Sequence, residues 1–205
     1  PLVRSTGVVV EHHPRPARPA GDRRRNLEIL EAELAAAGGA PAPRLLFYLA
    51  REYADLGESD RAIETFERYL AVATWDEEAY CALLRVADLH RTAGRYADAL
   101  DADRRATRLC PARPEAYFAL ARTSYFLGLW DEVIRWSDAG RGLPAPDTLL
   151  FVDPTDGRVG WIIYYTNALF RLGRVLAALD WTRTALMRSP DAPWHRENAL
   201  FFSGV

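Results

Sequence analysis

Few residues of this chain have the types and spacing that metal binding requires. His12 and His13 are adjacent, and imidazole is a common metal ligand. Adjacent side chains of an extended segment point to opposite faces, so at most one of the two would serve a given site. Asp101 and Asp103 form a D-x-D pattern, but residues two apart on a helix point to different sides. We expect exposed histidines and a solvated acidic surface, with no metal and no cofactor.

The common motifs of catalysis are absent from the sequence. It contains no glycine-rich phosphate loop, no G-x-S-x-G, no H-E-x-x-H and no cysteine pair at zinc spacing. Cys81 and Cys110 are too few for a disulfide framework in 205 residues, so we expect two reduced, partly buried thiols. We therefore expect no catalytic residue in this chain.

Composition narrows the classes of partner. The formal net charge is −2, whereas a dedicated nucleic-acid binder carries a basic excess. No apolar run approaches the length of a membrane span, and no signal-peptide pattern is present. We expect a cytoplasmic protein that binds neither nucleic acid nor membrane. Because the chain begins at Pro1 rather than Met, we also expect it to be a piece of a longer protein.

Rings and arginines recur at helical spacing and could form a binding surface. The segments FYLAR (47–51) and FALAR (118–122) both place an Arg four residues after a Phe. Alternating rings and guanidinium groups suit an acidic or aromatic peptide. The alternative is that the rings complete packing between helices while the arginines pair with local acids. Both interpretations remain open on the sequence alone.

Pairs of amphipathic helices must position these residues. In FYLAREYADLGESDRAIETFERYL, apolar residues recur at i, i+3, i+4 and i+7 on both sides of Gly57. The same pattern predicts pairs around Gly94, Gly128 and Gly173. Small residues stand seven before each glycine and five after it. They are Ala50, Ala87, Ala121 and Thr166 before the turns, and Ala62, Ala99, Val133 and Ala178 after them.

This arrangement resembles the tetratricopeptide repeat, a 34-residue helix-turn-helix with small residues at the helix crossing. Four copies cover about residues 43–74, 79–111, 113–146 and 158–190. The resemblance implies an all-α fold, an alpha-alpha superhelix, in which the first helix of each pair lines a concave face. The expected groove residues are Phe47, Arg51, Leu84, Asp88, Arg91, Phe118, Arg122, Tyr125, Asn167 and Phe170.

The regions outside these copies have other patterns. Residues 1–21 predict a short strand at Thr6–Val10 and a Pro/Arg linker, which could end an upstream domain. The solenoid should span 22–205, with Asp22 as the first helix cap, an insertion at 143–160 and a capping helix at 192–203. A purely structural alternative is a homo-oligomer that dimerises through Trp194, Phe201 and Phe202.

A second resemblance covers nearly the whole chain. The order VVVEHH, a Pro/Arg linker, Arg25-Asn26-Leu27, the segment Tyr48–Tyr53, and Trp75 with Glu77-Glu78 is similar to the C-terminal region of bacterial family 2 glycosyltransferases. It implies an accessory domain that binds the acceptor or mediates self-association. We nevertheless expect a non-catalytic repeat scaffold that binds a protein or peptide partner.

Overall fold

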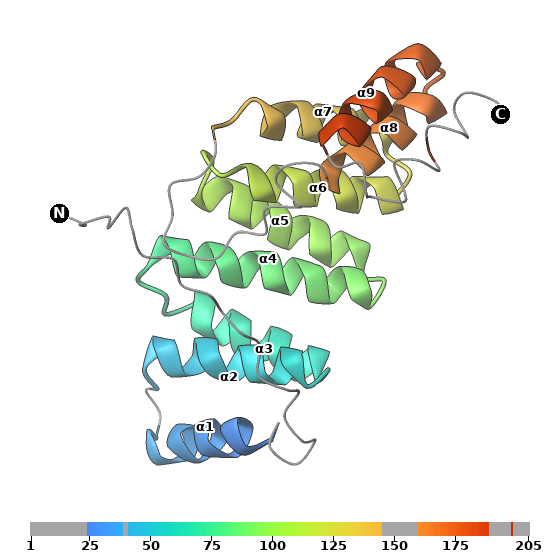
Figure 1. Cartoon of the computed structure of the whole chain (residues 1–205). Helices are drawn as coiled ribbons and strands as arrows, with labels where there is room; N and C mark the ends of the chain where they lie inside the picture. Colours follow the sequence, from blue (N-terminus) through green and yellow to red (C-terminus); the bar gives the residue numbers. More distant parts are fainter. Residues whose placement is uncertain (1–23, 39–40, 145–159, 189–197, 199–205) are drawn as a thin grey trace, which may run out of the picture.

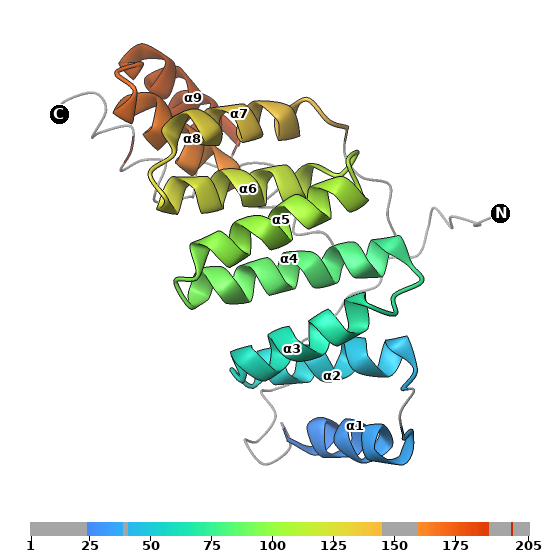
Figure 2. The same ribbon diagram turned by 180° about the vertical axis from the view of Figure 1, so that it is seen from behind.

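The computed structural model describes residues 24–38, 41–144, 160–188 and 198, and within them the regular elements are all helices. The helices stack in sequence order from α1 at one end to α8 and α9 at the other (Figures 1 and 2). They are α1 (Arg25–Ala36), α2 (Pro43–Asp55), α3 (Ser59–Leu70), α4 (Asp76–Thr92), α5 (Tyr96–Leu109), α6 (Pro114–Phe126), α7 (Trp130–Arg141), α8 (Trp161–Arg171) and α9 (Val175–Arg188). The predicted all-α superhelix is confirmed.

Consecutive helices form the predicted pairs. The most extensive packing joins α2 to α3, α4 to α5, α6 to α7 and α8 to α9, and weaker packing joins each pair to the next. α4 begins at Asp76, three residues before the predicted start of the second copy at residue 79. Neither helix of a pair can bury its apolar stripe alone, so the pairs stabilise one another as neighbours.

The turn inside each pair has the same backbone geometry. Gly57 has φ +80°, and Gly94, Gly128 and Gly173 have φ between +71° and +75°. The amide of Gly57 donates to the carbonyl of Ala54, and that of Glu58 to the carbonyl of Tyr53, which is a Schellman motif. The same two hydrogen bonds recur at the other three turns. A side chain at the glycine would be strained in this left-handed conformation, which explains the fixed position of glycine.

Small residues allow the paired helices to approach closely. All eight positions identified from the sequence are buried, Ala50, Ala62, Ala87 and Ala99 among them with no exposed surface. A third row, twelve residues after each turn glycine, is Tyr69, Ala106, Gly140 and Ala185, and it is buried as well. Larger side chains surround these crossings, such as Phe66 and Tyr69 in the first pair.

The first helix covers one end of the stack. Leu27 of α1 packs with Leu49, Tyr53 and Ala62 of the first pair. Ile29 of α1, by contrast, is 47 % exposed. A cap at Asp22, the strand at Thr6–Val10, the insertion and the helix at 192–203 lie outside the described residues.

The D-x-D prediction is wrong for one of its two aspartates. Asp101 is exposed as expected, but Asp103 has no exposed surface. The two residues do point to different sides of α5, and the side that Asp103 occupies faces α4 and α6. Its carboxylate accepts hydrogen bonds there from Arg91 and Thr123.

Candidate functional site

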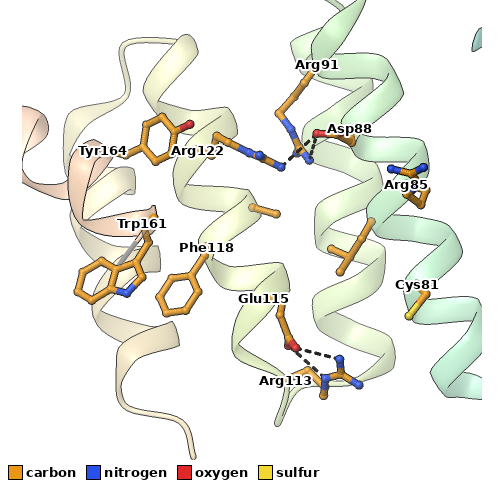
Figure 3. A pocket seen from close by; sticks show the side chains of 13 residues that line it. Cys81, Arg85, Asp88, Arg91, Arg113, Glu115, Phe118, Arg122, Trp161 and Tyr164 are labelled. Carbon is orange, nitrogen blue, oxygen red and sulfur yellow. Dashed lines mark hydrogen bonds and ion pairs between the residues drawn. The ribbon is translucent and has the colours of Figure 1, made fainter. Parts of the chain in front are cut away.

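A groove of about 450 Å³ opens across α4, α6 and α8 (Figure 3). These are the first helices of the second, third and fourth pairs, the helices predicted to line the concave face. Its walls combine apolar side chains, two aromatic residues of α8 and charged groups of α4 and α6. The lining residues are Cys81, Leu84, Arg85, Asp88, Arg91, Arg113, Glu115, Phe118, Ala119, Arg122, Gly160, Trp161 and Tyr164.

The groove is built from equivalent positions of successive pairs. Counted back from the turn glycine, α4 contributes the thirteenth, tenth, ninth, sixth and third residues, and α6 contributes the first four of these. α8 contributes the twelfth residue, Trp161, and the ninth, Tyr164, and Gly160 directly precedes this helix. The sequence prediction used the tenth, sixth and third positions. It missed the thirteenth and ninth, although these are one helical turn apart on the same face as the tenth and sixth.

A chain of ion pairs forms the charged wall. A guanidinium nitrogen of Arg122 lies 3.2 Å from a carboxylate oxygen of Asp88, and Arg91 lies 3.5 Å from the same oxygen. Arg85 pairs with Asp55 of α2 at 3.3 Å. The groove arginines therefore have acidic neighbours, as the packing alternative anticipated. A ligand carboxylate at Arg122 has to share or displace Asp88.

Arg113 closes the lower end of the groove in Figure 3. It pairs with Glu77 at 2.7 Å and with Glu115 at 2.9 Å, and it lies over the ring of Tyr80 with 4.7 Å to the centroid. The hydroxyl of Tyr80 accepts a hydrogen bond from the amide of Ala116 at 2.9 Å. That amide is in the first turn of α6, where no intrahelical partner exists, so Tyr80 of one pair caps the first helix of the next.

The apolar wall depends on one stacked ring pair. Phe118 and Trp161 lie parallel, with 5.3 Å between centroids and 4° between planes. Phe118 is 7 % exposed and packs in a core cluster with Ile162 and Leu169 of α8. Its ring therefore offers the groove an edge rather than a free face, and Trp161 and Tyr164 complete the wall.

Arg91 belongs to a buried polar network beneath the groove. Its guanidinium donates to Asp103 at 2.8 Å and to the Thr123 hydroxyl at 2.9 Å, and Thr123 donates to Asp103 at 2.7 Å. Burial raises the pKa of Asp103 against the lowering effect of Arg91. Arg91 lines the groove as predicted, but its charge is committed to Asp103, which the sequence prediction did not anticipate.

The first pair continues the same face with a different charge pattern. Arg44, Phe47, Tyr48 and Arg51 occupy the thirteenth, tenth, ninth and sixth positions before Gly57. Arg51 lies 5.9 Å from the Phe47 ring centroid, and Arg44 lies 5.5 Å from that of Tyr48 and donates to its hydroxyl. Within the described part of the chain, neither arginine has a carboxylate at ion-pair distance. This face of α2 therefore carries two positive charges without a close ion pair beside aromatic rings, although the charge of Glu78 acts on Arg44.

The structure brings only some of the predicted residues together. Leu84, Asp88, Arg91, Phe118 and Arg122 line one groove, and Phe47 and Arg51 lie on the equivalent face of α2. Three predicted residues lie outside the groove lining. Tyr125 packs edge-on against Trp130 and Tyr164, the Asn167 amide donates to the carbonyl of Ile163, and Phe170 packs against the core of the last pair.

Metal binding and thiol chemistry have little support among the described residues. Among the described residues no three His, Cys, Asp or Glu side chains come together as a metal site, and His12 and His13 lie outside them. Burial raises the pKa of the Cys81 thiol to about 11, which lowers its reactivity as a thiolate. No helix in the described part is both long and apolar enough to cross a bilayer.

The fold is thus that of a superhelix of helix pairs, and comparisons with known proteins agree. A family model described as Tetratricopeptide repeat matches residues 47–114, which span the first two pairs and the start of the third. No curated protein matches the sequence.

Solved structures share the architecture at low identity. MamA 41-end from Desulfovibrio magneticus RS-1 is similar with a TM-score of 0.66 and 18 % identity, over 84 % of this chain and 89 % of that one. A second MamA crystal structure has a TM-score of 0.66 and 19 % identity, over 85 % of this chain and 97 % of that one. YrrB, titled a TPR protein with an unusual peptide-binding site, is similar with a TM-score of 0.65 and 17 % identity, over 86 % of this chain and 83 % of that one. These likenesses establish the fold, and the glycosyltransferase resemblance stays a prediction.

Proposed function

We propose that the chain is a non-catalytic scaffold that binds a protein or peptide along its concave face. The observation that carries this proposal is that the first helices of three successive pairs line one groove of about 450 Å³, α4 and α6 with residues at four equivalent positions. Pockets of this size that combine apolar walls with a few placed polar groups are typical of ligand sites. The likeness to YrrB, whose title describes a peptide-binding site, supports a peptide as the ligand.

The charges of the face favour an acidic partner. Arg44 and Arg51 have no described carboxylate at ion-pair distance, while the arginines of the groove do. An extended segment with Asp or Glu over α2 and an apolar side chain at Leu84 and Trp161 would match both the arginines of α2 and the apolar wall of the groove. The two free thiols fit the reducing cytoplasm that the sequence predicts.

Peptide selection with matched variants tests this proposal. Peptides would be selected from a random display library on the wild-type chain, and their affinities measured by fluorescence anisotropy. Arg51→Glu with Arg122→Glu should weaken binding at least tenfold, a loss of about 1.4 kcal/mol or more. The control is Arg68→Glu with Arg104→Glu, the same charge change at exposed positions of second helices α3 and α5.

Two results would contradict the proposal. One is equal affinity of the groove variant and the control variant for every selected peptide. The other is the absence of acidic residues from the selected sequences, which would contradict an acidic partner but not binding in the groove. Circular dichroism melting of each variant separates lost binding from lost folding.

A further inference from the structure

The turn between α6 and α7 is apolar, unlike the other three turns of the stack. Its residues are Phe126, Leu127, Leu129 and Trp130 around Gly128. Phe126 is 48 % exposed, Leu127 41 % and Leu129 44 %. At the positions of Phe126 and Leu129 the other three turns carry polar or charged residues, whereas the position of Leu127 is also Leu in the first and last turns. These polar or charged residues are Asp55 and Glu58, Thr92 and Arg95, and Arg171 and Arg174. Single exposed apolar residues are ordinary, but several in one turn form a patch.

Ring contacts hold this patch in one conformation. Tyr96 of α5 stacks on Phe126 with 5.3 Å between centroids and 9° between planes. Tyr125 lies edge-on to Phe126 and to Trp130, at 5.8 Å and 5.5 Å. The turn itself is fixed by the Schellman hydrogen bonds at Gly128. A rigid apolar surface binds without a large loss of side-chain entropy. We define the turn patch as Tyr96, Phe126, Leu127, Leu129 and Trp130.

Positive charge borders the turn patch on the side of the last pair. The guanidinium of Arg171 lies 5.9 Å from the ring centroid of Trp130. Arg174 is in the same turn as Arg171, and neither makes an ion pair with a described residue. The one acidic residue next to the patch in sequence is Asp131, which is exposed. The apolar surface therefore has an excess of uncompensated arginine along one edge.

We propose that the turn patch is a second docking surface, which adjoins the groove at Tyr164 but shares no residue with its lining, and that it binds a short amphipathic segment of another protein. The segment would place Leu or Phe side chains on Phe126, Leu127 and Leu129, and Asp or Glu beside Arg171 and Arg174. The patch is confined to one turn and one neighbouring ring, whereas one partner of a stable dimer buries about 800 Å². A surface of this extent suits a short segment rather than a second copy of this chain.

Selection with counter-selection tests the proposal. A random 12-residue display library would be panned on the wild-type chain after depletion on Leu127→Ser with Leu129→Ser. The surviving peptides should be apolar and acidic, and should bind this variant at least tenfold more weakly than the wild type. Arg171→Glu should weaken them as well. The groove variant Arg51→Glu with Arg122→Glu should bind them normally, so the two surfaces are tested independently.

Three outcomes would overturn the proposal. Depletion could leave no peptide that distinguishes the wild type from the serine variant. The surviving peptides could be basic or indifferent to Arg171→Glu. Sedimentation equilibrium could show a dimer of the wild type that the serine variant lacks, which would assign the patch to a second copy. Each variant should keep the helical circular dichroism spectrum of the wild type, because the substituted residues are exposed, or in the case of Arg122 partly exposed.

Discussion

Gly140 sets how closely α7 approaches α6. It is buried within α7, and a Cβ built there would lie 2.8 Å from Cε1 of Phe118 and 3.0 Å from Cβ of Tyr117. The Phe118 ring is stacked on Trp161 on its other side, so it has little freedom to move away. A helical residue without a side chain is normally destabilising, and here the close packing of the two helices explains its presence.

Gly140→Ala should therefore lower the free energy of unfolding by about 1–3 kcal/mol, the usual cost of overpacking. Urea unfolding followed by circular dichroism would measure it. Gly142→Ala is the matched control, because the nearest atoms to a Cβ there are carbonyl oxygens at 3.6 Å. Equal stability of the two variants would contradict the packing described for Phe118.

Cys81 should react slowly with thiol reagents at neutral pH. Burial raises the pKa of its thiol from 9.0 to about 11, and two pKa units reduce the thiolate fraction about 100-fold. In a Cys110→Ser variant, labelling by a disulfide reagent at pH 8 should be slow in the folded chain and fast in urea. Labelling of the folded variant at the rate of the unfolded one would show that Cys81 is freely accessible.

At the scale of the elements, a buried ion pair connects three helices. Arg91 of α4, Asp103 of α5 and Thr123 of α6 bond to one another with almost no exposed surface. The Nε atom of Arg91 and one oxygen of Asp103 have no hydrogen-bond partner. Such a pair stabilises little in total, because desolvation offsets most of the attraction, but removal of one partner leaves a buried charge.

Asp103→Ala should cost about 3–5 kcal/mol of stability, because the buried Arg91 would lose its close partner and keep only the 3.5 Å contact with Asp88. The double variant Arg91→Met with Asp103→Leu should be considerably more stable than Asp103→Ala, since neither charge is then buried. Equilibrium urea unfolding of the wild type, the single and the double variant gives the comparison. If the single variant lost less than the double variant, the network would not depend on the charge pair.

At the scale of the whole molecule, buried tyrosines connect neighbouring pairs and make stability sensitive to alkaline pH. Burial is the main cause that raises the pKa of Tyr53 and Tyr165 to about 12, and it raises the pKa of Tyr69 and Tyr80 as well. The hydroxyl of Tyr69 donates to Glu78 of the next pair, and that of Tyr165 to Asp138 of the preceding one.

The free energy of unfolding should fall as the pH rises from 10 to 12. Above pH 10 the unfolded chain loses phenolic protons that the folded chain retains, so the unfolded state binds fewer protons and is favoured. Each such tyrosine lowers the free energy of unfolding by up to about 1.4 kcal/mol per pH unit in this range. Urea unfolding at pH 8 and pH 11 would measure the loss, and Tyr53→Phe should reduce it. A stability that is constant across this range would contradict the raised pKa values.

Much of the fold is determined by the sequence itself. Glycine at each turn, small residues seven before it and five after it, and the helical apolar period predicted the helix pairs and their packing. These are local requirements: a left-handed turn residue and a close helix crossing accept few side chains, so they mark the sequence directly. The groove positions at Leu84, Asp88, Phe118 and Arg122 followed from the same register.

Only the tertiary structure decided which of these residues keep a charge or a ring free for a partner. Arg91 and Asp103 are twelve residues apart and pair inside the stack, whereas Arg44 and Arg51 have no acidic partner in the described chain. Phe118 is covered by Trp161, which belongs to the next helix pair along the chain. Pairing and stacking between helices depend on three-dimensional distances that the spacing within one helix does not contain. The same reason hid the turn patch, whose Tyr96, Phe126 and Trp130 come together from three helices.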